Sequence, residues 1–313
     1  MSIDNTLFLE LVEAAIQSPS GHNTQPWKFA LTADGNMKVM PDYTRTLPAT
    51  DPSNRELLIS VGCATESISI YAASKGFSVH EQPENDAVII SFTESNKATD
   101  KKLSEAISTR QTNRNSYNGT KISHEAIGLL KAKGIMFYEN GTHEFAIINE
   151  HIETANNIQM NDERFKQELK QYMRYCENDA RKSGDGLSYD TLGVPSIPVF
   201  MRKSATALSL NASMQNRFNS KKIAGSSHFI VITGEDTVSG YIDTGRRLMR
   251  LLLKAETLGI ACAYMNQPCE LSTVRNMLKT ALSIDGVPQI ILRMGYSSRT
   301  PRSHRRPTTS FIE

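Results

Sequence analysis

Residues 18–27 read Ser-Pro-Ser-Gly-His-Asn-Thr-Gln-Pro-Trp, and the flanking sequence shows where this segment lies. Before it, apolar residues recur at helical spacing over residues 5–17. After it, the runs WKFAL (27–31) and MKVMP (37–41) are separated by an Asp-Gly turn signal, which is typical of a β-hairpin. We therefore expect residues 18–27 to form a loop between a helix and a strand.

The composition of this loop suits ligand binding. Small residues and Asn23 leave backbone N–H groups and an amide available to a planar polar ligand. A helix-ending turn with Trp27 as a core anchor explains the same residues, and from the residues alone it is the simpler interpretation.

Helical and strand patterns alternate along the remaining chain. Helices are expected at 54–75, 100–110, 123–133, 150–182, 202–218, 241–258 and 271–280. Short strands are expected at 87–92, 144–149, 228–233, 260–265 and 288–295. This order predicts a layered α+β (or α/β) fold with mixed or antiparallel sheets.

Composition excludes several classes of protein. The 313 residues carry a formal net charge of +2, which gives no long-range attraction to nucleic acid. There is no phosphate-binding loop of the Walker type, no G-x-G-x-x-G and no zinc motif, so no metal site is expected. The N-terminus does not resemble a signal peptide, no apolar run predicts a membrane helix, and the four cysteines form no C-x-x-C pair, so a cytoplasmic protein is expected.

A second candidate site lies at 110–114, Arg-Gln-Thr-Asn-Arg. Two guanidinium groups and the Thr112 hydroxyl, one residue apart, can converge on a phosphate. Arginines are also favoured at any solvated helix C-terminus, and that explanation is sufficient for Arg110 and Arg114 taken alone.

Both segments resemble motifs of the nitroreductase-like flavoproteins. The loop is similar to the P-S-x-x-N-x-Q-P-W loop of that superfamily, and the arginine segment is similar to its R-x-S-x-R/K phosphate motif, with Thr in place of Ser. The resemblance implies that FMN is the cofactor. It assigns the isoalloxazine and ribityl contacts to Pro19, Ser20, Gly21 and Asn23, and the phosphate contacts to Arg110, Thr112 and Arg114.

Three later segments extend the resemblance. Asn219 and Lys222 match an N-x-x-K stretch that binds the pyrimidine edge of the flavin, where a cation stabilises negative charge. The helix–strand junction that leads to Tyr264, Met265 and Asn266 resembles the segment facing flavin N5 and O4. A basic segment, 295–307, resembles the C-terminal segment that completes the phosphate site, with Arg302 and Arg305 as its predicted ligands.

The order of the motifs predicts a fused pseudo-dimer. In the usual homodimer the arginine motif precedes the loop, whereas here it follows the loop by about 80 residues in the sequence. We therefore expect one nitroreductase-like half at 1–100 and a second at 101–313, with an insertion or lid near 150–205. This resembles the fused, Acg-like branch, in which one FMN is shared by the two halves.

The resemblance implies an FMN-dependent NAD(P)H oxidoreductase. Ping-pong hydride transfer through flavin N5 would reduce nitroaromatic or quinone-type acceptors, and no catalytic acid–base residue is required. The expected partners are a nicotinamide donor and a small-molecule acceptor, with no nucleic acid and no membrane, in a monomer or a homodimer of it. A non-enzymatic FMN-storage protein with a lid over the flavin is the alternative, and nucleic-acid binding through residues 299–306 is a third class.

Overall fold

The computed structural model describes residues 3–96 and 101–313. The chain forms two compact units, each built from separate stretches of sequence. Unit 1 comprises residues 1–110, 235–257 and 305–313, and unit 2 comprises residues 111–234 and 258–304. The predicted halves, 1–100 and 101–313, thus differ from these units in extent, and their relatedness stays a prediction; residues 1–2 and 97–100 of the first half lie outside the described residues.

Unit 1 contains a four-stranded antiparallel sheet with the strand order β1-β2-β4-β3. The predicted hairpin and the 87–92 strand are confirmed, whereas β3 was not predicted because its outward face is polar. The strands are β1 (Trp27–Leu31), β2 (Met37–Pro41), β3 (Phe77–Glu84) and β4 (Ala87–Glu94).

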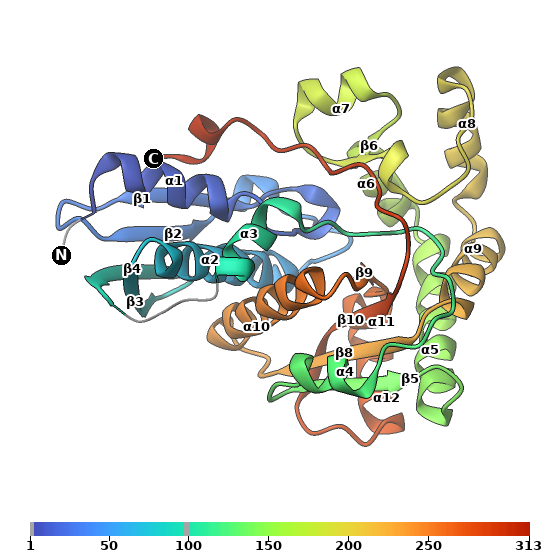
Figure 1. Cartoon of the computed structure of the whole chain (residues 1–313). Coiled ribbons are helices and arrows are strands. Elements are labelled where there is room, and N and C mark those ends of the chain that lie inside the picture. Colours follow the sequence, from blue (N-terminus) through green and yellow to red (C-terminus); the bar gives the residue numbers. More distant parts are fainter. Residues whose placement is uncertain (1–2, 97–100) are drawn as a thin grey trace. The chain divides into compact units, whose positions relative to one another are not determined.

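Helices α1 (Asn5–Ala15) and α2 (Arg55–Ser74) pack against this sheet (Figure 1), and α3 (Lys101–Thr109) and α10 (Val238–Thr257) pack against α2. Short 3-10 turns lie at Gly21–Asn23, Tyr43–Arg45 and Thr308–Phe311. The Asp4 side chain caps α1 by accepting from the Leu7 amide. α2 and α10 cross closely at two glycines: a Cβ at Gly62 would lie 2.0 Å from the Ile242 carbonyl oxygen, and one at Gly245 would lie 2.0 Å from that of Ile59.

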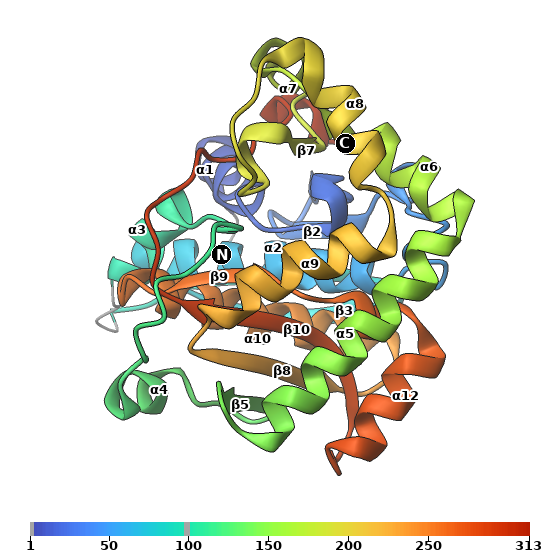
Figure 2. The same ribbon diagram turned by 90° about the vertical axis from the view of Figure 1, so that its right-hand side faces the viewer.

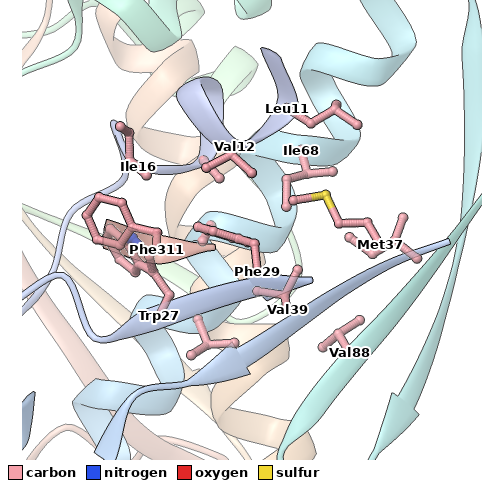
Figure 3. Packing of buried hydrophobic residues seen from close by; sticks show 14 of the residues in the cluster. Leu11, Val12, Ile16, Trp27, Phe29, Met37, Val39, Ile68, Val88 and Phe311 are labelled. Atoms are coloured by element: carbon pink, nitrogen blue, oxygen red, sulfur yellow. The ribbon is translucent and has the colours of Figure 1, made fainter. Parts of the chain in front are cut away.

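The core of unit 1 lies between the sheet and these helices (Figure 3). Trp27 and Phe29 from β1 are fully buried with Phe311 from the C-terminal segment, and Ile68 of α2 packs into the same cluster. Among the described residues, α2 is the one helix with the length and hydropathy of a membrane span. Of its apolar 18-residue stretch, 83% is buried inside the protein. Its apolar character is therefore explained by its place in the core.

Unit 2 contains a second four-stranded antiparallel sheet, with the order β5-β8-β10-β9. Its strands are β5 (Ile135–Glu139), β8 (His228–Gly234), β9 (Ala261–Tyr264) and β10 (Val287–Gly295). The accompanying helices are α4 (His124–Leu130), α5 (His143–Asn161), α9 (Ala212–Ala224), α11 (Gln267–Glu270) and α12 (Ser272–Ala281). α5 packs beside α9 and α12 (Figure 2). Helices with antiparallel sheets confirm the α+β class.

The segment between α5 and α9 is irregular. It contains α6 (Glu163–Tyr172), β6 (Met173–Arg174), α7 (Glu177–Ser183), β7 (Leu187–Ser188), a 3-10 turn (Tyr189–Thr191) and α8 (Val199–Ser209). β6 and β7 pair as a two-stranded parallel sheet. The predicted helices 150–182 and 202–218 are each interrupted, because Asp162 and Asn211 adopt extended conformations and cap new helices.

One predicted strand is wrong. Residues 144–149 belong to α5, because the Thr142 side chain caps the helix by accepting from the Phe145 amide at 3.3 Å. Phe145, Ile148 and Ile152 then lie on one buried helical face. The strand at this position of the sheet is β5, which the sequence analysis did not predict.

Candidate ligand-binding site

A cavity of about 570 Å³ lies in unit 2. Its lining comes from α9, β9, β10 and the irregular segment between α5 and α9, together with Arg114. Three cationic side chains line it, Arg114, Lys222 and Arg293, and no carboxylate is among its described lining residues. Its size is within the range of small-molecule and cofactor sites.

One face of α9 lines the cavity with both polar and apolar side chains. Gln215, Phe218, Asn219 and Lys222 recur at three- and four-residue spacing, so they lie on one side of the helix. The helix begins there because the Asn211 side chain accepts from the Met214 amide at 3.0 Å.

The Lys222 ammonium group is held inside this cavity. Its Nζ donates to the Leu192 carbonyl at 2.8 Å. Burial, with the nearby charges of Arg293 and Arg114, lowers the pKa of Lys222 from its ordinary value of 10.5 to about 7. The amine thus titrates near neutral pH, and a negative ligand would favour its protonated form.

Arg293 was missed by the sequence analysis. It projects from β10 and is 1% exposed, its Nη2 donates to the Asn115 carbonyl at 2.8 Å, and its guanidinium lies 4.0 Å from the centre of the Tyr117 ring. Burial lowers its pKa. A single arginine inside the apolar run QIILRMG was the signal that could have revealed it.

Arg114 lies against the turn that precedes α8. Its Nη1 donates to the Thr191 carbonyl at 3.4 Å, and burial lowers its pKa. Gly193, with a φ of +62°, approaches the Arg114 backbone so closely that a Cβ would lie 2.2 Å from the Arg114 carbonyl oxygen. Only glycine combines that conformation with that space.

These features fit an anionic, planar polar ligand. Three cations of like charge are crowded at one cavity, and such crowding is costly unless a negative group compensates it. Within the described part of the chain, the buried Nε of Arg293 and Nδ2 of Asn219 have no hydrogen-bond partner. A ligand with a negative group and carbonyl acceptors would satisfy both.

The 18–27 loop lies in unit 1 and has an unusual backbone. His22, Asn23 and Gln25 have positive φ values of 46°, 57° and 54°. The Ser20 hydroxyl accepts from the Gln25 amide at 2.9 Å and holds the turn closed. Backbone strain of this kind is concentrated at functional sites in proteins, and here it coincides with the predicted cofactor loop.

Arg305 fastens this loop. Its guanidinium donates to the carbonyls of Ile16, Gln17 and Ser18 and, at 3.1 Å, to Oδ1 of Asn23.

Arg110 is a second buried cation beside the same loop. Its Nη2 donates to the Gln17 carbonyl at 2.9 Å. Its Nε and Nη1 are buried, and the residues that the structure describes offer them no partner. Unit 1 therefore has donors of its own to which an anion could bind.

The structure thus separates the predicted site residues into three groups. Unit 1 brings together Pro19, Ser20, Gly21, Asn23, Arg110 and Arg305. The cavity in unit 2 is lined by Arg114, Asn219, Lys222, Tyr264 and Met265. Outside the cavity lining lie Thr112, Asn266 and Arg302.

Two of the residues outside the lining have a clear environment. The Asn266 side chain accepts from the Ile291 amide at 3.0 Å and connects the end of β9 to β10. Arg302 is exposed. The prediction that one FMN uses the residues of both units stays a prediction.

No family model matches the sequence. The chain is 24% identical to "Putative NAD(P)H nitroreductase Rv3131" of Mycobacterium tuberculosis, over 96% of this chain and 89% of that protein. It is also 24% identical to "Probable NAD(P)H nitroreductase PigM" of a Serratia species, over 93% of this chain and 89% of that protein. A shorter match of 65 residues is 35% identical to "Putative NAD(P)H nitroreductase acg" of M. tuberculosis, over 21% of this chain and 19% of that protein.

Solved structures overlap with part of the chain. An FMN-bound nitroreductase of Bacteroides fragilis is 13% identical, with a TM-score of 0.38, over 66% of this chain and 93% of that one. The nitroreductase NfnB of Mycobacterium smegmatis, in complex with NADPH, is 14% identical, with a TM-score of 0.40, over 65% of this chain and 94% of that one. Similarity to these curated relatives over nearly the whole chain supports the nitroreductase-like superfamily of oxidoreductases.

Proposed function

We propose that this protein is an FMN-dependent NAD(P)H oxidoreductase that reduces planar acceptors of the quinone or nitroaromatic type. The names of its full-length relatives support the NAD(P)H-dependent reductase activity. The loop and arginine motifs of the sequence support FMN as the cofactor.

The observation that carries the proposal is the convergence of Arg114, Lys222 and Arg293 on one cavity whose described lining contains no carboxylate. FMN has a doubly charged phosphate and a ring edge of carbonyls and ring nitrogens. These groups would supply the negative charge and the hydrogen-bond acceptors that the donors of the cavity lack. When bound, FMN supplies a two-electron carrier that accepts electrons from NAD(P)H and passes them to an acceptor.

The protein's own residues have three tasks in this proposal. The cations hold and stabilise negative charge, and the Asn219 amide donates to a ring acceptor. The apolar side chains of the cavity exclude water. The overall reaction converts NAD(P)H, one proton and a quinone into NAD(P)⁺ and a hydroquinone, so no side chain has to act as a nucleophile.

We also propose that the chain is a fused pseudo-dimer of two related nitroreductase-like halves, that it works in the cytoplasm, and that it is a monomer or a homodimer of the fused chain. Light scattering coupled to size exclusion measures the last of these directly.

The test begins with the absorbance spectrum of the purified chain, which should show flavin bands near ~450 nm, either at once or after FMN is added. Under anaerobic conditions, NADPH should then bleach these bands within the turnover time, and a quinone should restore them. A chain that binds no FMN contradicts the proposal. A chain whose bound flavin resists NADPH and NADH is a storage protein instead.

A matched pair of variants connects the spectrum to the cavity. Lys222→Met should weaken FMN binding at least tenfold, because a charged hydrogen-bonding partner is lost. Lys221→Met is the control, since Lys221 is exposed on the same helix. Equal FMN affinity in the two variants would show that the cavity is not the flavin site.

A further inference from the structure

The cavity in unit 2 opens to solvent between α8 and α9. Leu208 and Met214 line it, yet they are 73% and 39% exposed, so they form its rim. Arg293 lines the same cavity and is 1% exposed, so it marks the closed end. Along α9, the eight steps from Met214 to Lys222 span about 12 Å at 1.5 Å per residue. The site is therefore a passage from an apolar rim to a cationic end.

The wall of this passage is strongly apolar. It includes Leu169, Met173, Leu192, Ile197, Leu208 and Met214, which come from α6, β6, the turn before α8, α8 and α9. These side chains offer no hydrogen bond to the polar edge of a flavin. The flavin ring itself is apolar at one end only, so it can cover only part of this wall. The wall thus offers more apolar surface than the proposed cofactor can use.

Further apolar side chains are exposed at the start of α8. Val199, Phe200 and Met201 are 52%, 83% and 47% exposed, and they follow Ile197 of the cavity lining by two to four residues. Scattered exposed apolar residues are ordinary on a protein surface, whereas three consecutive ones close in sequence to an apolar cavity wall suit an apolar ligand. A polar, fully hydrated substrate would gain nothing from such a path.

We infer that the acceptor is an amphiphilic molecule, a quinone or nitroaromatic ring with an alkyl chain of several carbons, whose chain lies along the wall between α8 and α9. Leu208 and Met214 are then specificity-determining residues, because they contact the part of the chain nearest the solvent. This inference rests on the proposed function and adds the class of acceptor to it.

The experiment uses the full-length, FMN-loaded protein with saturating NADPH and a series of 2-alkyl-1,4-benzoquinones from methyl to hexyl. The value of kcat/KM should rise about three- to fourfold per added methylene, which corresponds to about 0.8 kcal/mol for each buried CH₂. Leu208→Glu should abolish most of this rise for the longer chains. Met277→Glu, at an exposed apolar residue of α12 that does not line the cavity, should keep the full rise.

A binding measurement separates this inference from the proposed function. Calorimetric titration with 4-alkylphenols, which are not reduced, should show affinity that grows with chain length in the wild type and far less in Leu208→Glu. Leu208→Gln serves as a second, uncharged variant if the glutamate variant unfolds. A reductase whose kcat/KM and phenol affinity do not depend on chain length overturns the inference and leaves the proposed function standing. If the purified chain binds no FMN but its affinity for the phenols still grows with chain length, the proposed function is contradicted and the apolar path for an alkyl chain is not.

Discussion

Arg110 and Arg305 donate to the same backbone carbonyl, that of Gln17, at 2.9 and 3.1 Å. Arg110 is the last residue of the first stretch of unit 1, and Arg305 is the first residue of its C-terminal stretch. Two guanidinium groups on one carbonyl place positive charge against the end of α1 and the strained loop that follows it. Arg305 uses its donors to fix the loop, whereas Arg110 keeps two buried nitrogens without a partner in the described structure.

Replacing Arg305 should destabilise unit 1. Arg305→Ala removes the donors to the carbonyls of residues 16–18 and to Asn23, and we expect the free energy of unfolding to fall by about 3 kcal/mol, since hydrogen bonds from a charged group contribute about 1.5–3 kcal/mol each and are not additive. Urea unfolding followed by the fluorescence of Trp27, which packs in the same unit, measures the change. Arg302→Ala is the exposed control, and an equal effect of both substitutions would refute the role of Arg305 in fixing the loop.

Replacing Arg293 should affect ligand-induced stability more than intrinsic stability. At a hundredfold excess over Kd, FMN should stabilise the wild type by about 2.7 kcal/mol, and Arg293→Met should lose most of that gain. The loss of two donated hydrogen bonds is partly offset in the ligand-free protein, because a buried cation is removed from beside Lys222. Thermal unfolding with and without FMN measures both quantities. An undiminished FMN-induced shift in Tm for Arg293→Met would exclude Arg293 from the site.

The pH dependence of FMN binding should follow Lys222. Its pKa of about 7 in the folded protein lies below the ordinary 10.5, and a phosphate or an anionic ring favours the protonated amine. Binding should therefore be tightest below pH 7 and weaken as the pH rises through 7 to 9, a range in which the phosphate of FMN keeps its full charge. Fluorescence titration at each pH checks this, and Lys222→Met should give a flatter profile than Lys221→Met.

The same residue predicts a stability effect of opposite sign. Between pH 7 and 10.5 the unfolded chain holds the proton on Lys222 and the folded chain does not, so the free energy of unfolding of the ligand-free protein should rise with pH across that window. In Lys222→Met this part of the rise should disappear. A rise of the same slope in both proteins would mean that the Lys222 amine is not desolvated.

Gly193 should tolerate no side chain. Gly193→Ala places a Cβ 2.2 Å from the Arg114 carbonyl oxygen and also requires a positive φ, so we expect a loss of about 2–4 kcal/mol together with weaker FMN binding. Gly259→Ala is the matched control, because its φ of +67° is almost the same and nothing lies within 4 Å of the added Cβ. Chemical denaturation compares the two, and only the difference between them reports the contact with Arg114.

Local sequence patterns determined much of the secondary structure. The hairpin of β1 and β2 alternates buried and partly buried residues at its start, α2 has apolar residues at helical spacing, and β8 and β10 are short, almost continuously buried apolar runs, so neighbouring residues alone predict these elements. The same applies to the loop at 18–27, whose glycine, proline and asparagine content is visible in the sequence. Residues 144–149 misled the prediction because a short apolar run suits a strand or a buried helix, and the cap at Thr142 decided for the helix.

Tertiary structure alone decided which distant residues share a site. Lys222 was predicted from a motif, but its low pKa comes first from burial and then from the charges of Arg293 and Arg114, which reach it from β10 and from the segment after α3. Likewise, α10 and the C-terminal residues follow residues 111–234 in the sequence, yet they belong to unit 1. The reason is that Ile242 of α10 and Phe311 of the C-terminal stretch complete the core of that unit. Periodicity reports which face of an element is apolar, whereas burial, charge crowding and desolvation depend on what that face meets after folding, and no local pattern contains that information.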